Sequence, residues 1–169
     1  MTIRAVCCGA LLALLAGCGG TKTVTRTVTV ETGAKAGVGA PLELVEYGYI
    51  ESLIRKGDGY ELRFDPALSL TGKTANVAAA EDGRVEAGEP VPNDYYVVDE
   101  GHRLLTYRVR ADATVTVLTD GPQGTPVTLA ELADIVAGDH EPLWEPISTG
   151  FWIRYRIDTV RSIDQQYHP

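Results

Sequence analysis

The chain has 169 residues, of which 44% are hydrophobic, and its formal net charge at pH 7 is −8. This length is sufficient for one domain with a substantial core. The acidic balance argues against nucleic acid as a partner, because such binding needs a basic face. Beyond residue 17, no apolar run approaches the about 20 residues that a membrane-spanning helix needs.

The start of the chain carries the most specific motif. Arg4 supplies a positive charge before an apolar run over 5–16, which is too short to span a bilayer. Charge followed by a short apolar core and small residues is typical of an export signal that is later removed. The run closes in Leu15-Ala16-Gly17-Cys18, which resembles the lipobox of bacterial lipoproteins. This resemblance implies cleavage before Cys18 and a diacylglyceryl group on its thiol, whereas the alternative is an ordinary secretion signal with an incidental cysteine.

These features predict three parts. Residues 1–17 would be a lipoprotein signal peptide, 18–40 the lipidated cysteine with a Thr/Gly/Ala-rich tether, and 41–169 a single β-rich extracytoplasmic domain. We expect the protein to be anchored in the cell membrane through diacylglyceryl-Cys18, because two acyl chains make a stable anchor. The alternating threonines of 21–30 would also suit an edge strand, although their place directly after the anchor favours an extended linker.

The first elements of the domain are predicted as a hairpin and a helix. A β-type stretch runs over 42–55, and Gly48 inside it indicates a bend or bulge. Gly57-Asp58-Gly59 predicts a turn into a second strand over 60–64, which Asp65-Pro66 would end. A short helix is expected over 71–83, with Thr71 as N-cap and Gly83 as the stop.

The second half of the chain alternates again between apolar and polar residues. Strands are predicted over 95–98, 104–109 and 114–118, followed by a capping box at Thr128-Leu129-Ala130-Glu131 and a helix that ends at Gly138. A last pair of strands covers 150–157 and 159–163. Alternation in its first strand places four apolar side chains on one face: Phe151, Ile153, Tyr155 and Ile157.

Six or seven short strands with two short helices predict a mainly β domain. We expect a small closed or half-closed β-barrel, with a β-sandwich as the alternative. The glycine-bent first strand, the early hairpin and a helix between strands resemble an oligonucleotide/oligosaccharide-binding (OB) type of barrel. This resemblance concerns topology alone and implies no activity.

The strongest candidate binding residues lie on the predicted strands. Trp152, Arg154 and Arg156 should point outward, opposite their apolar neighbours. By the same alternation Arg108 and Arg110 point outward from the strand over 104–109. An outward Trp with several arginines on an acidic domain is typical of an anion- or partner-binding face. The competing interpretation is that these arginines pair with neighbouring carboxylates on the sheet surface.

Two weaker candidates remain. Asp94 and Tyr95, just after two prolines, form a second polar-aromatic site. His140 lies between two carboxylates and is a candidate base for an envelope hydrolase, although an exposed loop histidine explains it as well. A zinc site would need further ligands, and the sequence indicates no metal and no cofactor.

The expected function is therefore that of a binding or assembly module at the bacterial cell envelope. Its predicted partners are the lipid bilayer, through Cys18, and an envelope protein or an anionic ligand, with nucleic acid excluded. An envelope hydrolase with a site near His140 is the alternative.

Overall fold

The computed structural model describes residues 42–99, 101, 103–139 and 143–168. The predicted signal peptide, Cys18, the tether and His140 lie outside these residues. The elements in chain order are β1 (Leu44–Lys56), β2 (Gly59–Thr71), α1 (Gly72–Glu81), η1 (Pro92–Asp94), β3 (Tyr95–Val98), β4 (Leu105–Val117), β5 (Thr125–Val127), α2 (Leu129–Ala137), η2 (Ile147–Thr149), β6 (Phe151–Arg156) and β7 (Thr159–Gln165).

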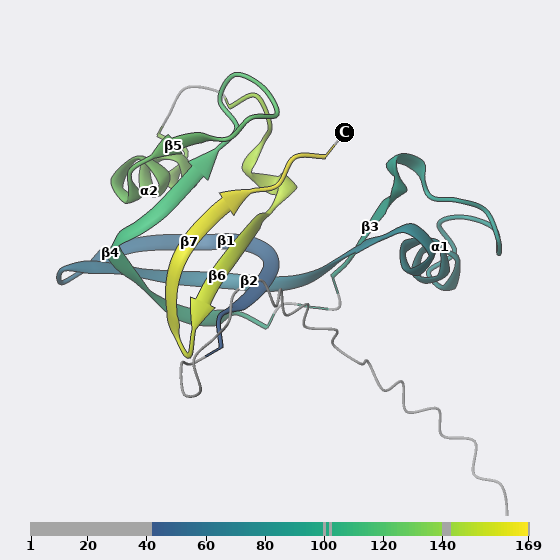
Figure 1. Ribbon diagram of the computed structural model, residues 1–169, viewed down its shortest axis with the longest axis horizontal. Helices are drawn as coiled ribbons and strands as arrows, with labels where there is room; N and C mark the ends of the chain where they lie inside the picture. The colour runs from purple at the N-terminus through teal and green to yellow at the C-terminus, as the bar shows by residue number, and fades with distance from the viewer. Residues whose placement is uncertain (1–41, 100, 102, 140–142, 169) are drawn as a thin grey trace, which may run out of the picture.

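Five of the strands close into a barrel (Figure 1). β1 pairs with β2, β2 with β4, β4 with β7, β7 with β6, and β6 returns to β1. The β4–β7 pair is parallel and the other four are antiparallel. This closed barrel, with α2 preceding its fourth strand, confirms the OB-like prediction and excludes the β-sandwich. β3 and β5 extend the sheet outside the barrel, on β2 and β4 respectively.

The barrel closes because β1 bends around Gly48. Residues 44–48 of β1 pair with β6, whereas residues 47–56 pair with β2. A Cβ atom at Gly48 would lie 2.2 Å from the Asp65 carbonyl oxygen and 2.8 Å from the Phe64 ring. A bulge between Ile50 and Ser52 adds to the bend. The bend predicted at Gly48 is therefore confirmed, and only glycine fits this approach of the two strands.

The interior of the barrel forms the main core, and α2 covers part of it. The largest fully buried side chains come from the barrel strands and α2: Leu62, Phe64, Val117, Leu132, Phe151, Ile153, Val160 and Ile163. The predicted capping box starts α2, since the Thr128 hydroxyl accepts the Glu131 N–H and the Glu131 carboxylate accepts the Thr128 N–H. Gly138 ends the helix in the left-handed conformation, as predicted.

A small lobe is inserted between the second and third barrel strands. It contains the end of β2, α1, η1 and β3, and projects to one side of the barrel (Figure 1). Ala75, Ala79 and Val91 form its own core. The predicted helix is confirmed, but the expected end of the strand at Asp65-Pro66 is wrong. β2 continues through Pro66, which pairs with Gly48 of β1. On the other side of β2, Pro66 lies between the segment that pairs with β4 and the segment that pairs with β3, so neither of these strands needs an N–H from it.

Two further strand predictions need correction. The strands predicted over 104–109 and 114–118 are one strand, β4, which is bent where its register with β7 shifts between Val109 and Thr114. Ile157 does not share the inward face of β6. That strand ends at Arg156, and Ile157 lies in the following turn with a φ of 60° and 81% exposure.

The short strand β5 had no counterpart in the sequence-based prediction. In the described part of the chain, no helix is long and apolar enough to cross a bilayer.

Candidate binding site

The structure gathers the predicted arginines on one side of the barrel. Arg108 and Arg110 lie on β4 and Arg154 and Arg156 on β6, with β7 between these strands. Thr159 of β7 pairs with Arg108 on one side and with Arg156 on the other. β7 itself contributes a further arginine, and we call the whole set the arginine face: Arg108, Arg110, Arg154, Arg156 and Arg161.

The outward direction of these side chains follows from strand alternation. Tyr107 and Val109, on either side of Arg108, are buried in the barrel, and so is Val160 beside Arg161. From residue 41 onward the sequence has 11 Arg or Lys against 22 Asp or Glu. Five of these 11 cations lie on the arginine face, so nearly half of the cations of the acidic domain are gathered on three adjacent strands.

Sequence reasoning missed Arg161. The inward residues of β7 are Val160 and Ile163, which are three positions apart because β7 bulges against Arg154 and Tyr155 of β6. This spacing hides the alternation that would have marked Arg161 as outward.

Arg110 and Arg156 of the arginine face lie beside carboxylates, as the competing interpretation expected. Arg110 donates two hydrogen bonds of 2.6 Å to Asp112. These bonds and the nearby charges of Arg110 and Arg161 lower the pKa of Asp112. The Nε atom of Arg156 lies 3.7 Å from a Glu43 carboxylate oxygen.

Arg108 differs from these two. Among the residues that the structure describes, none forms an ion pair with its exposed guanidinium.

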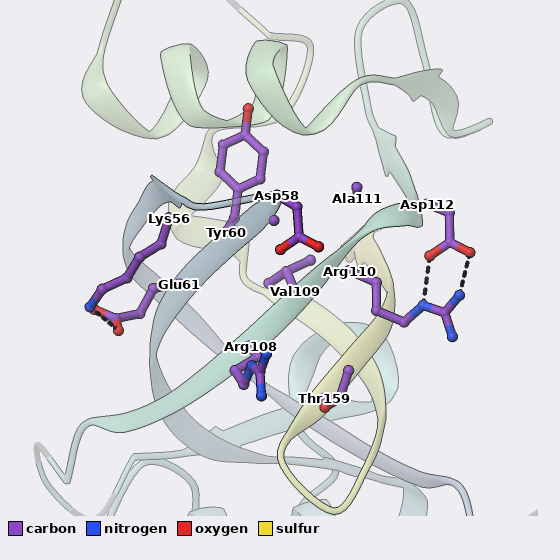
Figure 2. Close-up of a pocket in the computed structure, with 11 residues that line it drawn as sticks. Lys56, Asp58, Tyr60, Glu61, Arg108, Val109, Arg110, Ala111, Asp112 and Thr159 are labelled. Carbon is purple, nitrogen blue, oxygen red and sulfur yellow. Dashed lines mark hydrogen bonds and ion pairs between the residues drawn. The ribbon is translucent and has the colours of Figure 1, made fainter.

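Arg108 borders a groove of about 650 Å³ between the β1–β2 turn and β4 (Figure 2). Lys56 and Glu61 form an ion pair of 2.5 Å on one side, and Arg110 and Asp112 form the pair on the other. Gly59 brings the turn close to β4, because a Cβ atom there would lie 2.4 Å from the Val109 carbonyl oxygen.

The formal charges around this groove cancel. Apart from the two ion pairs, the lining contains the cation of Arg108 and the carboxylate of Asp58. Tyr60 also lines the groove, but its ring points away from the two arginines and packs against the core (Figure 2). The groove therefore offers Arg108 as its free cation within the described residues, without an exposed aromatic platform.

Trp152 and Tyr95 belong to a different cluster. The Trp152 ring is 5.2 Å from Tyr47, and Tyr47 is 6.5 Å from His168. Tyr95 stacks on His168 at 4.3 Å, and the Trp152 indole N–H donates to the Gln166 side chain. Trp152 is half-buried in this cluster, which joins β1, β6 and β3 to the end of the described chain, so it is not an exposed anchor beside the arginines.

The buried phenols near these surfaces have structural roles. Burial raises the pKa of Tyr47 and of Tyr107 far above the ordinary value. The Tyr47 hydroxyl donates to the Thr149 carbonyl oxygen, and the Tyr107 hydroxyl donates to a Glu46 carboxylate oxygen, both at 2.6 Å. Both groups therefore stay neutral donors at any ordinary pH.

The remaining candidates are not brought to the arginine face. Asp94 is exposed in η1 with a φ of 57°. The hydrolase prediction depends on His140, which lies outside the described residues, and stays a prediction. Within the described part of the chain, no three His, Cys, Asp or Glu side chains are grouped to hold a metal ion.

Comparisons with known proteins identify no relative of this chain. No family model, no curated protein and no solved structure matches the chain. The case for a function therefore depends on the residues and their arrangement.

Proposed function

We propose that this protein is a lipid-anchored binding module of the bacterial cell envelope, and that the arginine face holds an anionic partner. The observation that carries this proposal is the concentration of five arginines on three adjacent strands of an otherwise acidic domain. Scattered surface cations would not gather nearly half of the positive charges of an acidic domain on one side of the barrel.

The chemistry of the face favours phosphate or carboxylate groups on the partner. A guanidinium presents planar, fork-like donors that match both groups, and it stays charged at any physiological pH. Arg108 borders the groove and has no ion-pair partner among the described residues, whereas Arg110 and Arg156 lie beside Asp112 and Glu43. A partner would therefore meet Arg108 next to arginines whose positions neighbouring carboxylates restrain.

The envelope location rests on the lipobox-like motif. Cleavage before Cys18 and lipidation of its thiol would place the domain on the extracytoplasmic side of the cell membrane, with the tether between them. The barrel then needs no membrane-spanning segment of its own, since two acyl chains supply a stable anchor.

The proposal is tested with the mature chain, residues 18–169, in which Cys18→Ser removes the lipid. Inorganic polyphosphate and poly-glutamate serve as phosphate and carboxylate probes, and binding is measured by calorimetry at low ionic strength, where charge interactions are least screened. The double variant Arg108→Ala, Arg161→Ala removes two exposed cations of the face. Lys73→Ala, an exposed cation on α1 of the lobe, is the matched control.

We expect at least one probe to bind, with affinity about ten-fold or more lower in the double variant, since a hydrogen bond to a charged group contributes about 1.5–3 kcal/mol. The control variant should bind as the parent does. If neither probe binds, or if the double variant and Lys73→Ala bind alike, the arginine face is not the binding site.

A further inference from the structure

We infer that one end of the barrel rests on the bilayer that carries the anchor, with Leu42 and Ile157 inserted at the membrane surface. We call these two residues the apolar tip. This inference rests on the lipid anchor of the proposed function, but it concerns apolar side chains beside the arginine face and not its cations.

The apolar tip joins the two most exposed large hydrophobic side chains of the described residues. Ile157 is 81% and Leu42 is 64% exposed. Leu44 of β1 pairs with Tyr155 of β6, and Glu43 lies 3.7 Å from Arg156. Leu42 and Ile157 are the residues next to Glu43 and Arg156, so both lie at the same end of the β1–β6 pair. Covering two large apolar side chains that are exposed to water at one end of the barrel lowers the free energy of the system.

The backbone at Ile157 strengthens this argument. Its φ of 60° lies in the left-handed region, which β-branched residues avoid because of steric clash. Glycine would make the same two-residue turn without strain. The turn itself therefore does not explain isoleucine here, and retained strain of this kind points to a role for the side chain.

The apolar tip is flanked by one ion pair and one further carboxylate. Arg156 lies 3.7 Å from Glu43, and the Asp158 carboxylate accepts a hydrogen bond from the neutral Thr159 hydroxyl. Since the charged neighbours of the tip along the described chain include no unpaired cation, contact through the tip should be driven by apolar burial, and high salt should not weaken it. Binding at the arginine face should weaken steeply as salt rises.

The position of the tip identifies the bilayer as its occupant. Leu42 is where the chain enters the described domain, 24 positions after Cys18. An unpacked chain of that length has an end-to-end distance of about 27 Å, so the anchor would hold this end of the barrel near the acyl chains. Tethering raises the local concentration of lipid, so insertion of only two side chains is sufficient to keep this end of the barrel in contact with the membrane.

The experiment uses the lipidated protein, purified from membranes and reconstituted in phosphatidylethanolamine/phosphatidylglycerol vesicles. Cys7 and Cys8 would leave with the signal peptide and Cys18 would be lipidated, so Ile157→Cys introduces a single free thiol for an environment-sensitive fluorophore. The matched control is Ile54→Cys, which is 60% exposed but lies beside the β1–β2 turn. Lipids with a quencher on the acyl chain report insertion.

We expect a blue-shifted and strongly quenched signal from the label at 157, unchanged by high salt, and little quenching at 54. Equal quenching at both positions, or none at 157, overturns the inference.

Mass spectrometry of the same sample separates the two proposals. Lipid present on Cys18 without quenching at 157 refutes the membrane contact alone, whereas absence of the lipid refutes the anchor on which it rests. Crosslinking of the 157 thiol to a protein in cells, without quenching in vesicles, would identify a protein partner instead and also overturn it.

Discussion

Substitution of Gly48 by alanine should open the barrel where β1 passes from β6 to β2. The added Cβ atom would lie 2.2 Å from the Asp65 carbonyl oxygen, and ordinary contact begins at 3.4 Å, so the two strands would have to separate by about 1.2 Å. The Phe64 ring blocks a second direction at 2.8 Å. Overpacking of a closely packed site costs about 1–3 kcal/mol. Because backbone and a buried ring must both move here, we expect about 3 kcal/mol or more.

Thermal unfolding followed by circular dichroism measures this loss. For a domain of this size, 1 kcal/mol corresponds to about 4 °C in Tm, so Gly48→Ala should lower Tm by about 12 °C. The control is Gly83→Ala, where φ is +68° and no atom lies within 4 Å of the new Cβ. Its cost is backbone strain alone, about 1 kcal/mol. Equal losses in the two variants would refute the close approach of β1 and β2 at Gly48.

Three further outcomes are expected. Ile157→Gly should raise Tm by about 4–8 °C, because it relieves about 1–2 kcal/mol of left-handed strain, while it weakens membrane contact; an unchanged Tm would contradict the strain. Thr128→Ala should lower the free energy of unfolding by about 1 kcal/mol in urea titration, because the capping box at α2 is lost. Burial lowers the pKa of His168, and Glu145 raises it in part, so NMR titration should find its pKa below the ordinary 6.5. Since the folded state disfavours the protonated ring, stability should be retained above pH 6.5 and fall as the pH decreases through that value; a pKa above 6.5 would contradict this.

Local signals in the sequence predicted most of the elements. The capping box at Thr128, the turn at Gly57-Asp58-Gly59 and the bend at Gly48 each depend on residues close together in the chain, and all three are confirmed. The barrel could also be expected, because a sheet of short alternating strands leaves unpaired backbone groups at its edges and closure into a barrel pairs them.

The errors arose where pairing between distant strands decides the structure. Pro66 fits inside β2 because neither β4 nor β3 pairs with it, which depends on partners far away in the sequence. Ile157 leaves the inward face because β6, which faces a bulge of β7 at Arg154 and Tyr155, ends before it. Alternation alone therefore identified which residues are apolar, but not where each strand stops.

The candidate site shows the same division. Alternation placed four of the arginines outward, yet only the strand order shows that β7 lies between β4 and β6 and adds Arg161. Trp152 was predicted as an exposed anchor. Its contact with Tyr47, which covers part of the ring, follows from the pairing of β1 with β6 and could not be seen in the sequence. The sequence alone therefore could not identify every residue of the site, because the order of the strands in the sheet decides which side chains lie together.

Mass spectrometry of the mature protein, isolated from its native membrane, bears on the whole account. We predict a chain that begins at Cys18 and carries diacylglyceryl on that sulfur. An unmodified Cys18 thiol, or a product that still contains residues 1–17, would contradict the anchor on which the envelope location and the membrane contact depend.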